Sequence, residues 1–139
     1  MKKHVYHLDQ TTRQIIFDRL ALELAKEPGI VFAYVYGSAV DSEWVHDVDV
    51  GLYLDDSQLP RRFEFSCALA DRLSDAIEIP VDVRILNAAP VSFLFHVLCG
   101  QLLFSRDEEQ LTDLLEEIPR RYLDIAPLLR QYTKEAFAT

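Results

Sequence analysis

The chain has 139 residues, of which 50% are hydrophobic and 27% are charged, and its formal net charge is −9. This length and apolar content suit one domain with its own hydrophobic core and argue against disorder. Arg61-Arg62 and Arg120-Arg121 are short basic pairs, and the sequence contains no longer basic stripe. Because binding to a nucleic-acid backbone depends on clustered Lys and Arg, we expect no direct nucleic-acid binding. An acidic surface suits a basic protein partner or, locally, a divalent cation.

The sequence predicts a cytoplasmic protein. The longest apolar stretch, residues 30–36, is far shorter than a membrane span, and no apolar run of a signal peptide follows the Met1-Lys2-Lys3-His4 terminus. Cys67 and Cys99 lie in apolar helical patterns, without CxxC spacing and without a histidine at ligand spacing. This setting predicts buried, reduced thiols rather than a disulfide or a metal site.

In chain order, the first predicted element is a helix capped by Thr11 or Thr12 and ended by Glu27-Pro28-Gly29. A β-branched and aromatic run then predicts a strand that Gly37-Ser38 ends, and a second strand follows after a short polar connection. A third strand follows the next helix, and a short edge strand comes last. The strands are predicted over residues 30–36, 47–54, 81–86 and 102–104.

Helices are predicted between and after these later strands. Pro60 suits the first position of a helix, whose apolar residues recur at every fourth position. The buried stripe of this helix is predicted to be Phe65, Leu69, Leu73 and Ile77. A short helix opens at residues 87–90 and ends at Gly100. Residues 107 to about 137 are predicted to be helical, with breaks near Pro119 and Pro127.

The order of elements predicts the fold class. Two neighbouring strands without a crossover helix argue against a doubly wound parallel sheet. The chain is therefore predicted to be an α+β protein with a small mixed β-sheet packed by helices. We expect a single domain over residues 1–139, with a core at about 9–105 and a helical tail at about 107–137.

Gly37-Ser38 is the first feature that suggests chemistry. A glycine directly after an apolar strand lets the backbone approach a ligand closely, and exposed N–H groups together with a serine hydroxyl can hold phosphate oxygens. An ordinary turn is the simpler interpretation of this pair when it is taken alone.

Asp47 and Asp49 are the second feature. Alternate residues of a strand share a face, so both carboxylates point one way while Val48 and Val50 point into the core. Aspartate is a poor strand former, so a pair on one face is locally costly. The pair predicts either convergence on a cation or a solvated strand face.

Asp82 is the third feature, because it interrupts the apolar strand Val81-Asp82-Val83-Arg84-Ile85. If this strand pairs beside the second one, Asp82 joins Asp47 and Asp49 on one face. Three clustered carboxylates raise one another's pKa unless a cation neutralises them. Mg²⁺ suits such an all-oxygen set completed by triphosphate oxygens, and Mn²⁺ accepts the same ligands.

Together, the strand, Gly37-Ser38, the Asp47-Val48-Asp49 strand and the later Asp82 resemble the polymerase-beta-like nucleotidyltransferase superfamily. The small size is similar to its minimal nucleotidyltransferase branch, and the similarity covers roughly residues 30 to 105. Members of this branch are often antitoxins encoded beside HEPN-domain ribonuclease toxins. The resemblance implies transfer of AMP from ATP to a tyrosine of the toxin, which silences it.

The resemblance also implies a role for each matched residue. Gly37 and Ser38 would bind the triphosphate. Asp47 and Asp49 would ligate both metal ions. Asp82 would be the third ligand and would help to remove the acceptor's proton.

Three details depart from the pattern of the branch. Eight residues separate Ser38 from Asp47, where about ten are expected. Ala39 stands where arginine is frequent, and His46 replaces the usual serine. The shorter connection favours a second hypothesis, a non-catalytic antitoxin that acts by binding alone. A third hypothesis is a transferase that modifies a small molecule such as an aminoglycoside, whose positive charge an acidic surface would attract.

Several other residues have two interpretations. His46 is a surface-loop residue or a contact for phosphate, and His96 is interpreted as an ordinary helix residue. Trp44 packs over the site or against a partner, or stacks on a base. Arg84 pairs with Asp82 or with substrate. An apolar stripe in the tail is interpreted as core, with part of it available to a partner; it comprises Tyr122, Leu123, Leu128, Leu129 and Tyr132.

Overall fold

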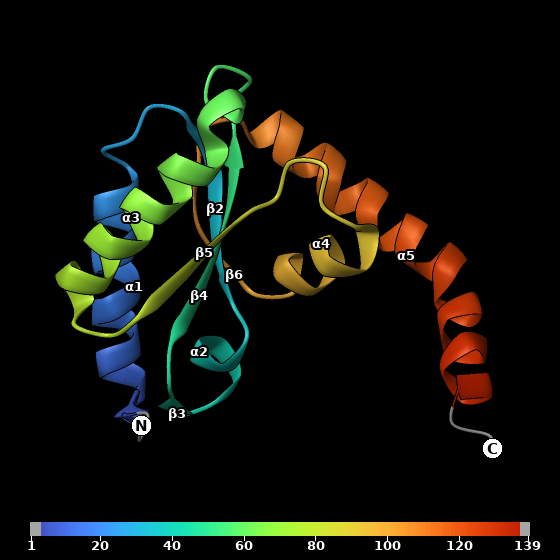
Figure 1. Cartoon of the computed structure of the whole chain (residues 1–139), viewed down its shortest axis with the longest axis horizontal. Coiled ribbons are helices and arrows are strands. Elements are labelled where there is room, and N and C mark those ends of the chain that lie inside the picture. The colour runs from blue at the N-terminus through green and yellow to red at the C-terminus, as the bar shows by residue number, and fades with distance from the viewer. Residues whose placement is uncertain (1–3, 137–139) are drawn as a thin grey trace.

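The computed structural model describes the backbone of residues 4–136 and the side chains of residues 4–131. Its centre is a four-stranded sheet in the order β5-β4-β2-β6 (Figure 1). β2 runs antiparallel to both β4 and β6, whereas β4 and β5 are parallel, so the sheet is mixed as predicted. The strands are β1 (Tyr6–His7), β2 (Ile30–Tyr36), β3 (Trp44–Val45), β4 (Val48–Leu54), β5 (Val81–Ile85) and β6 (Gln101–Ser105).

Helices cover both faces of this sheet. They are α1 (Gln10–Leu24), α2 (Ser38–Asp41), the 3-10 turn η1 (Leu59–Arg61), α3 (Arg62–Ile77), α4 (Val91–Leu98) and α5 (Glu108–Ala136). The larger core joins α1 and α3 to one face of the sheet, through residues such as Leu20, Leu73 and Val50. The smaller core joins α4 and α5 to the other face, through Tyr34, Val97 and Leu111. None of the helices in the described chain is long and apolar enough to cross a membrane.

The larger core supplies a direct test of the fold. Leu20 is completely buried in it, so Leu20→Ala should lower the free energy of unfolding by about 2–5 kcal/mol. Leu22 lies on the same helix but is exposed, so Leu22→Ala should change it by less than about 0.5 kcal/mol. Urea denaturation measures both, and equal losses would contradict this assignment of the helix faces.

The start of α1 corrects the predicted helix cap. Asp9, not Thr11 or Thr12, caps the helix: its extended backbone precedes Gln10, and its Oδ1 accepts a hydrogen bond of 2.7 Å from the N–H of Thr12. The carboxylate reaches the free N–H groups of the first turn because it stands one residue before the helix.

The tail corrects the predicted breaks. α5 is one continuous helix that contains both Pro119 and Pro127. Each proline follows a buried residue, Ile118 and Ala126, and the Tyr122 ring stacks on Phe95 of α4 at 4.1 Å. Packing against α4 therefore holds the helix through positions that local sequence alone disfavours.

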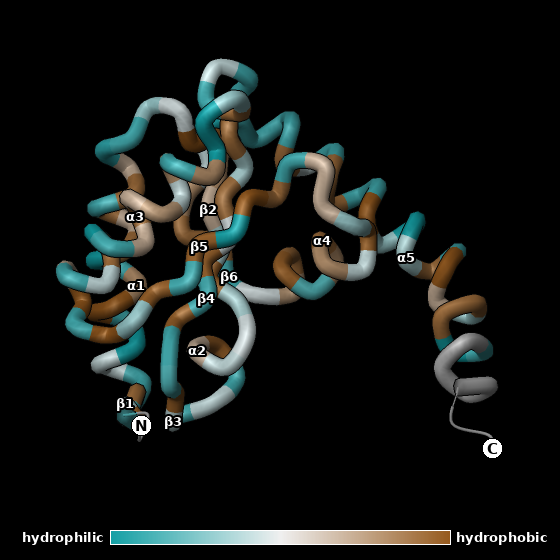
Figure 2. The backbone as a smooth tube through the Cα atoms, in the orientation of Figure 1, coloured by the Kyte–Doolittle hydropathy of each residue, from teal (hydrophilic) through white to brown (hydrophobic). Residues whose placement is uncertain are grey.

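The far part of α5 and the two cysteines also differ from the predictions. Leu123, Leu128 and Leu129 are exposed rather than core residues, and the side chain of Tyr132 lies outside the described residues. Figures 1 and 2 show this part of α5, with hydrophobic residues along it, pointing away from the body. Cys67 and Cys99 are free thiols, as predicted, but both are exposed rather than buried.

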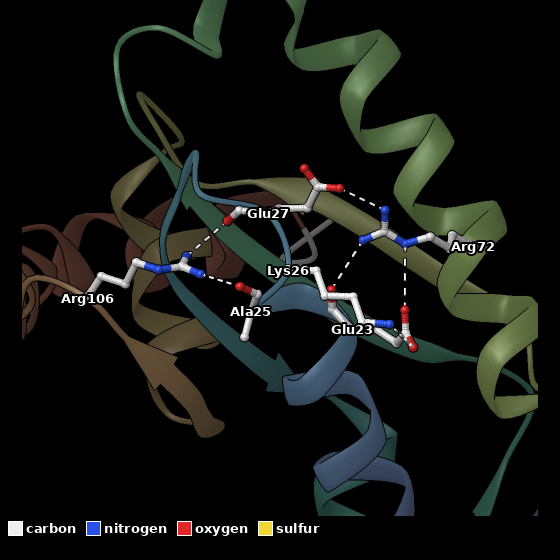
Figure 3. A network of polar contacts seen from close by, with 6 residues as sticks. All are labelled: Glu23, Ala25, Lys26, Glu27, Arg72 and Arg106. Atoms are coloured by element: carbon white, nitrogen blue, oxygen red, sulfur yellow. Dashed lines mark hydrogen bonds and ion pairs between the residues drawn. The ribbon is translucent and has the colours of Figure 1, made fainter.

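A polar network that the sequence did not suggest fastens the end of α1 (Figure 3). Glu23 is only 6% exposed, and its carboxylate lies 3.0 Å from Lys26 Nζ, with Arg19 and Arg72 nearby. The hydrogen bond from Lys26 is the main cause that lowers the pKa of Glu23. Arg72 of α3 also pairs with Glu27 at 2.7 Å. The network therefore ties α3 to the connection between α1 and β2.

Candidate functional site

The turn after β2 has a backbone conformation that favours glycine. Gly37 has φ 76° and ψ −147°, a region that other residues enter only with strain. A Cβ atom at Gly37 would lie 2.9 Å from Asp49 Oδ2, so the glycine backbone passes directly beside that carboxylate. Ser38 follows as the exposed first residue of α2. The pair predicted to hold phosphate therefore lies next to one of the predicted metal ligands.

Three polar residues form a row across the sheet. Tyr36 of β2 pairs with Asp49 of β4, and Asp49 pairs in turn with Asp82 of β5. Their strand neighbours Val48, Val50, Val81 and Val83 belong to the core beneath α1 and α3. Because side chains alternate between faces, the row lies on the face that carries α4. The predicted pairing of the second and third strands is thus found, and it brings Asp49 and Asp82 side by side.

Asp47 stands just outside this row. The strand was predicted to begin at Asp47, but β4 begins at Val48, and Asp47 is an exposed residue at its entrance. It still contributes to the electrostatics of the site, because its charge raises the pKa of Asp49.

Burial and negative charge converge on Asp49. Burial is the largest cause that raises the pKa of Asp49 above its ordinary value, followed by the charges of Asp47 and Asp82. Burial, reinforced mainly by Asp49, also raises the pKa of Tyr36 to about 12. The Tyr36 hydroxyl therefore stays protonated at neutral pH. A divalent cation at this position would relieve the repulsion among the carboxylates.

Asp82 has a partner on its own strand. Its Oδ2 accepts a hydrogen bond of 3.1 Å from Nε of Arg84; the Arg84 side chain is largely exposed and that of Asp82 is half-exposed. Of the two interpretations of Arg84 from the sequence, the structure shows the pairing with Asp82. Among the described side chains, no three His, Cys, Asp or Glu residues are grouped so that they could hold a metal ion as they stand. The carboxylate oxygens are of the type that a hard cation prefers, but they are not gathered around one point, and Asp82 is paired with Arg84.

Comparison with protein families identifies the domain. Residues 19–109 match the family described as polymerase beta, nucleotidyltransferase. The chain belongs to this family. The match includes Gly37, Ser38 and the three aspartates, so the resemblance seen in the sequence is confirmed at the level of the family. No relative was found among curated proteins.

Solved structures share the fold of this nucleotidyltransferase domain. One is a complex of a tri-AMPylated Shewanella oneidensis HEPN toxin with an MNT antitoxin, with 15% identity, a TM-score of 0.60, and coverage of 87% of this chain and 98% of that one. A toxin–antitoxin structure with AMP-PNP has 15% identity and a TM-score of 0.58, and the match covers 84% and 98% of the two chains. The MntA-HepT toxin–antitoxin structure has 15% identity and a TM-score of 0.58, with coverage of 86% and 98%. At this level of identity the likeness shows a shared fold.

Two residues that the structure places near these aspartates received no functional interpretation from the sequence. Tyr36 was interpreted only as part of a strand, and His96 only as a helix residue. The His96 ring meets the Tyr36 ring edge-on at 5.6 Å, and its charge lowers the pKa of Asp49. His96 also lines a small cavity of about 100 Å³ beside Gly37. Only the pairing of β2 with β4 and the packing of α4 bring these residues together.

Trp44 and His46 lie in the connection between the glycine turn and β4. Trp44 belongs to β3, which pairs with β1, and its exposed ring stacks on His7 at 4.4 Å. The Nδ1 atom of His46 lies 3.0 Å from the carbonyl oxygen of His4. These contacts join the short connection to β1 and to the residue His4 before it.

The raised pKa of Asp49 predicts a pH-dependent cost in stability. A carboxyl group that holds its proton more tightly when folded favours the folded state at low pH, and stability falls as the pH rises from about 3.8 through the raised pKa. The Tm advantage of Asp49→Asn over the wild type should therefore grow across this range and stay constant above it.

Thermal unfolding in EDTA between about pH 3 and pH 8 measures this difference. A Tm difference that is the same at every pH, or that shrinks as the pH rises, would contradict the assigned direction of the shift.

Proposed function

We propose that this chain is an antitoxin that transfers AMP from ATP to a tyrosine hydroxyl of a HEPN ribonuclease toxin. The observation that carries the proposal is the row of Asp49 and Asp82 beside Gly37 in a domain of the nucleotidyltransferase family. The AMPylated toxin and the AMP-PNP complex among the structures of the same fold support the choice of adenylyl transfer and of the partner.

Asp47, Asp49 and Asp82 would hold Mg²⁺, or Mn²⁺ in its place, once Arg84 releases Asp82. When bound, the metal would neutralise the phosphates of ATP and the charge that develops during transfer. Gly37 suits the phosphate side of the site because its backbone has no side chain to keep ATP away, and the exposed Ser38 hydroxyl is free to donate to a phosphate oxygen.

The reaction forms one bond and breaks another. The acceptor oxygen bonds to the α-phosphorus of ATP, the bond from this phosphorus to the bridging oxygen breaks, and pyrophosphate leaves with the electron pair. Asp82 would take the proton of the acceptor hydroxyl and pass it to solvent. Asp82 lies at the end of the row and its side chain is half-exposed, which suits contact with both the acceptor hydroxyl and solvent.

The exposed part of α5 supports a protein partner. Leu123 and Leu128 are 68% and 67% exposed on a helix that points away from the body (Figure 1). Exposed apolar side chains grouped in this way mark a protein–protein interface more often than an ordinary surface. A hetero-oligomer with the toxin in the cytoplasm would cover them.

Intact-mass spectrometry tests this proposal. The product of the adjacent gene is incubated with the chain, ATP and Mg²⁺, beside an Asp47→Ala/Asp49→Ala double variant. Mass increments of one or more AMP groups that depend on the wild-type chain are expected. If the partner binds stably but gains no mass, adenylyl transfer is refuted for this pair.

The second candidate function is an antitoxin that acts by binding alone. One observation favours it: the carboxylates are not gathered as a metal site, and Asp82 is paired with Arg84. An Asp49→Ala variant that protects cells from the toxin as well as the wild type would support this alternative over transfer.

A further inference from the structure

A second cavity lies on the outer side of Asp82, beyond the row of site residues. It has a volume of about 430 Å³ and lies between α3 and β5. Asp82 is the one residue of the proposed transfer site that lines it. The other lining residues are Arg62, Phe63, Ser66, Cys67 and Ala70 of α3, and Val83, Arg84 and Ile85 of β5.

The cavity follows a free sheet edge. β5 is the terminal strand of the four-stranded sheet, and among the strands of residues 4–136 it pairs with β4 alone. The carbonyl of Pro80 and the N–H of Leu86 bond to β4, so the even-numbered residues of this strand face β4. The alternation of a strand therefore turns the backbone groups of Val83 and Ile85 to the open edge, where they can pair with an added strand.

The position of the cavity fits the direction of the proposed reaction. Gly37, Asp49 and Asp82 follow one another across β2, β4 and β5. With the triphosphate at Gly37, pyrophosphate leaves on the β2 side, and in-line displacement brings the acceptor from the opposite side. The cavity begins at Asp82 on that opposite side.

The lining indicates the chemistry of the occupant. Arg62 and Arg84 line this cavity with a single carboxylate, that of Asp82, which pairs with Arg84, so the lining has an excess of positive charge on a chain whose net charge is −9. Phe63 adds an apolar ring that is 76% exposed. Two arginines and an exposed ring beside free backbone groups suit an extended acidic segment that also carries an aromatic or apolar side chain.

We propose that the edge of β5 and the cavity beside α3 bind the segment of the partner protein that carries the acceptor hydroxyl, as an added strand. This inference rests on the proposed function. Main-chain pairing with Val83 and Ile85 positions the segment, and its acidic side chains meet Arg62 and Arg84. Asp82 lies where this cavity meets the proposed transfer site.

Filling the cavity tests the inference. Cys67→Trp introduces a bulky ring into it, whereas Ala68→Trp adds the same ring at the next position of α3, which is exposed and does not line the cavity. With the adjacent gene's product as acceptor, Cys67→Trp should raise the KM for the acceptor by about tenfold or more, with the KM for ATP unchanged. Ala68→Trp should change both by less than about twofold.

Other kinetic results would overturn the inference. Equal effects of the two variants would mean that the cavity has no special role. A raised KM for ATP with an unchanged KM for the acceptor would assign the cavity to the nucleotide. Circular dichroism and Tm show that each variant is folded.

Crosslinking gives a test that does not depend on transfer. In a Cys99→Ser background, benzophenone maleimide on Cys67 should crosslink the partner within one short acidic segment, mapped by mass spectrometry. If the wild type adds no AMP to the partner, the proposed function fails. The crosslink then decides by itself whether the cavity and the β5 edge bind that segment. No crosslink, or crosslinks scattered over the partner, overturns the inference.

Discussion

Asp49→Asn should reduce AMP transfer to the partner by about a hundred- to a thousandfold or more while the fold persists. Asp49 is the centre of the row, because it pairs with both Tyr36 and Asp82 in the sheet. Its carboxylate also lies beside the backbone of Gly37. Asparagine keeps the size of the side chain but removes the charge that a cation and the reacting phosphate require. The initial rate of AMP incorporation at saturating ATP and Mg²⁺ measures the loss.

Asp56→Asn is the matched control, because Asp56 is an exposed residue of the turn after β4. It should retain the wild-type rate within about twofold. Thermal unfolding completes the test: Asp49→Asn should be at least as stable as the wild type at neutral pH, since it removes a half-buried charge. An active Asp49→Asn variant, or an unfolded one, would refute the role assigned to this residue.

The strands were the part of the fold most open to prediction. The run Ile30–Tyr36 is β-branched and aromatic on both faces, and β2 has the predicted bounds. A strand of this kind must be central, because it is buried on both sides. The alternation in β4 and β5 was equally informative, since Val48, Val50, Val81 and Val83 point into the core. It followed that Asp49 and Asp82 would share the other face.

The errors arise where neighbouring residues compete or where packing overrides local preference. Asp9, Thr11 and Thr12 all carry oxygen atoms able to cap a helix, and the sequence does not settle which one stands immediately before its first turn. Pro119 and Pro127 disfavour a helix locally, yet α5 continues because the residues before them pack on the body.

The sequence suggested the candidate site as a set of residue types and less as a set of contacts. Gly37, Ser38 and the three aspartates were proposed from spacing and residue type, and their roles stay predictions. Tyr36 and His96 were not, because their place beside Asp49 depends on strand pairing and on the packing of α4. The pairing of Asp82 with Arg84 depends on side-chain rotamers, so sequence left it as one of two interpretations.

Gly37→Ala should impair both stability and transfer. The backbone at this position, with φ 76° and ψ −147°, is accessible to glycine and strained for alanine, at a cost on the order of 1–3 kcal/mol in the free energy of unfolding. The new methyl group would also lie 2.9 Å from Asp49 Oδ2, so the carboxylate or the turn must move. A displacement of this size at the reacting centre should lower the rate of transfer by about a hundredfold.

Ser38→Ala is the control for stability alone, because Ser38 is exposed and carries no such backbone requirement, whereas its hydroxyl belongs to the proposed phosphate site. It should change the free energy of unfolding by less than about 0.5 kcal/mol. Urea denaturation and the rate of AMP incorporation, measured on both variants, separate strain from chemistry. If Gly37→Ala were as stable and as active as the wild type, the turn would not need glycine, and its backbone would have no role beside Asp49. A loss of stability without a loss of transfer would mean that the glycine serves the fold alone, and that the phosphates of ATP approach the aspartates from another side.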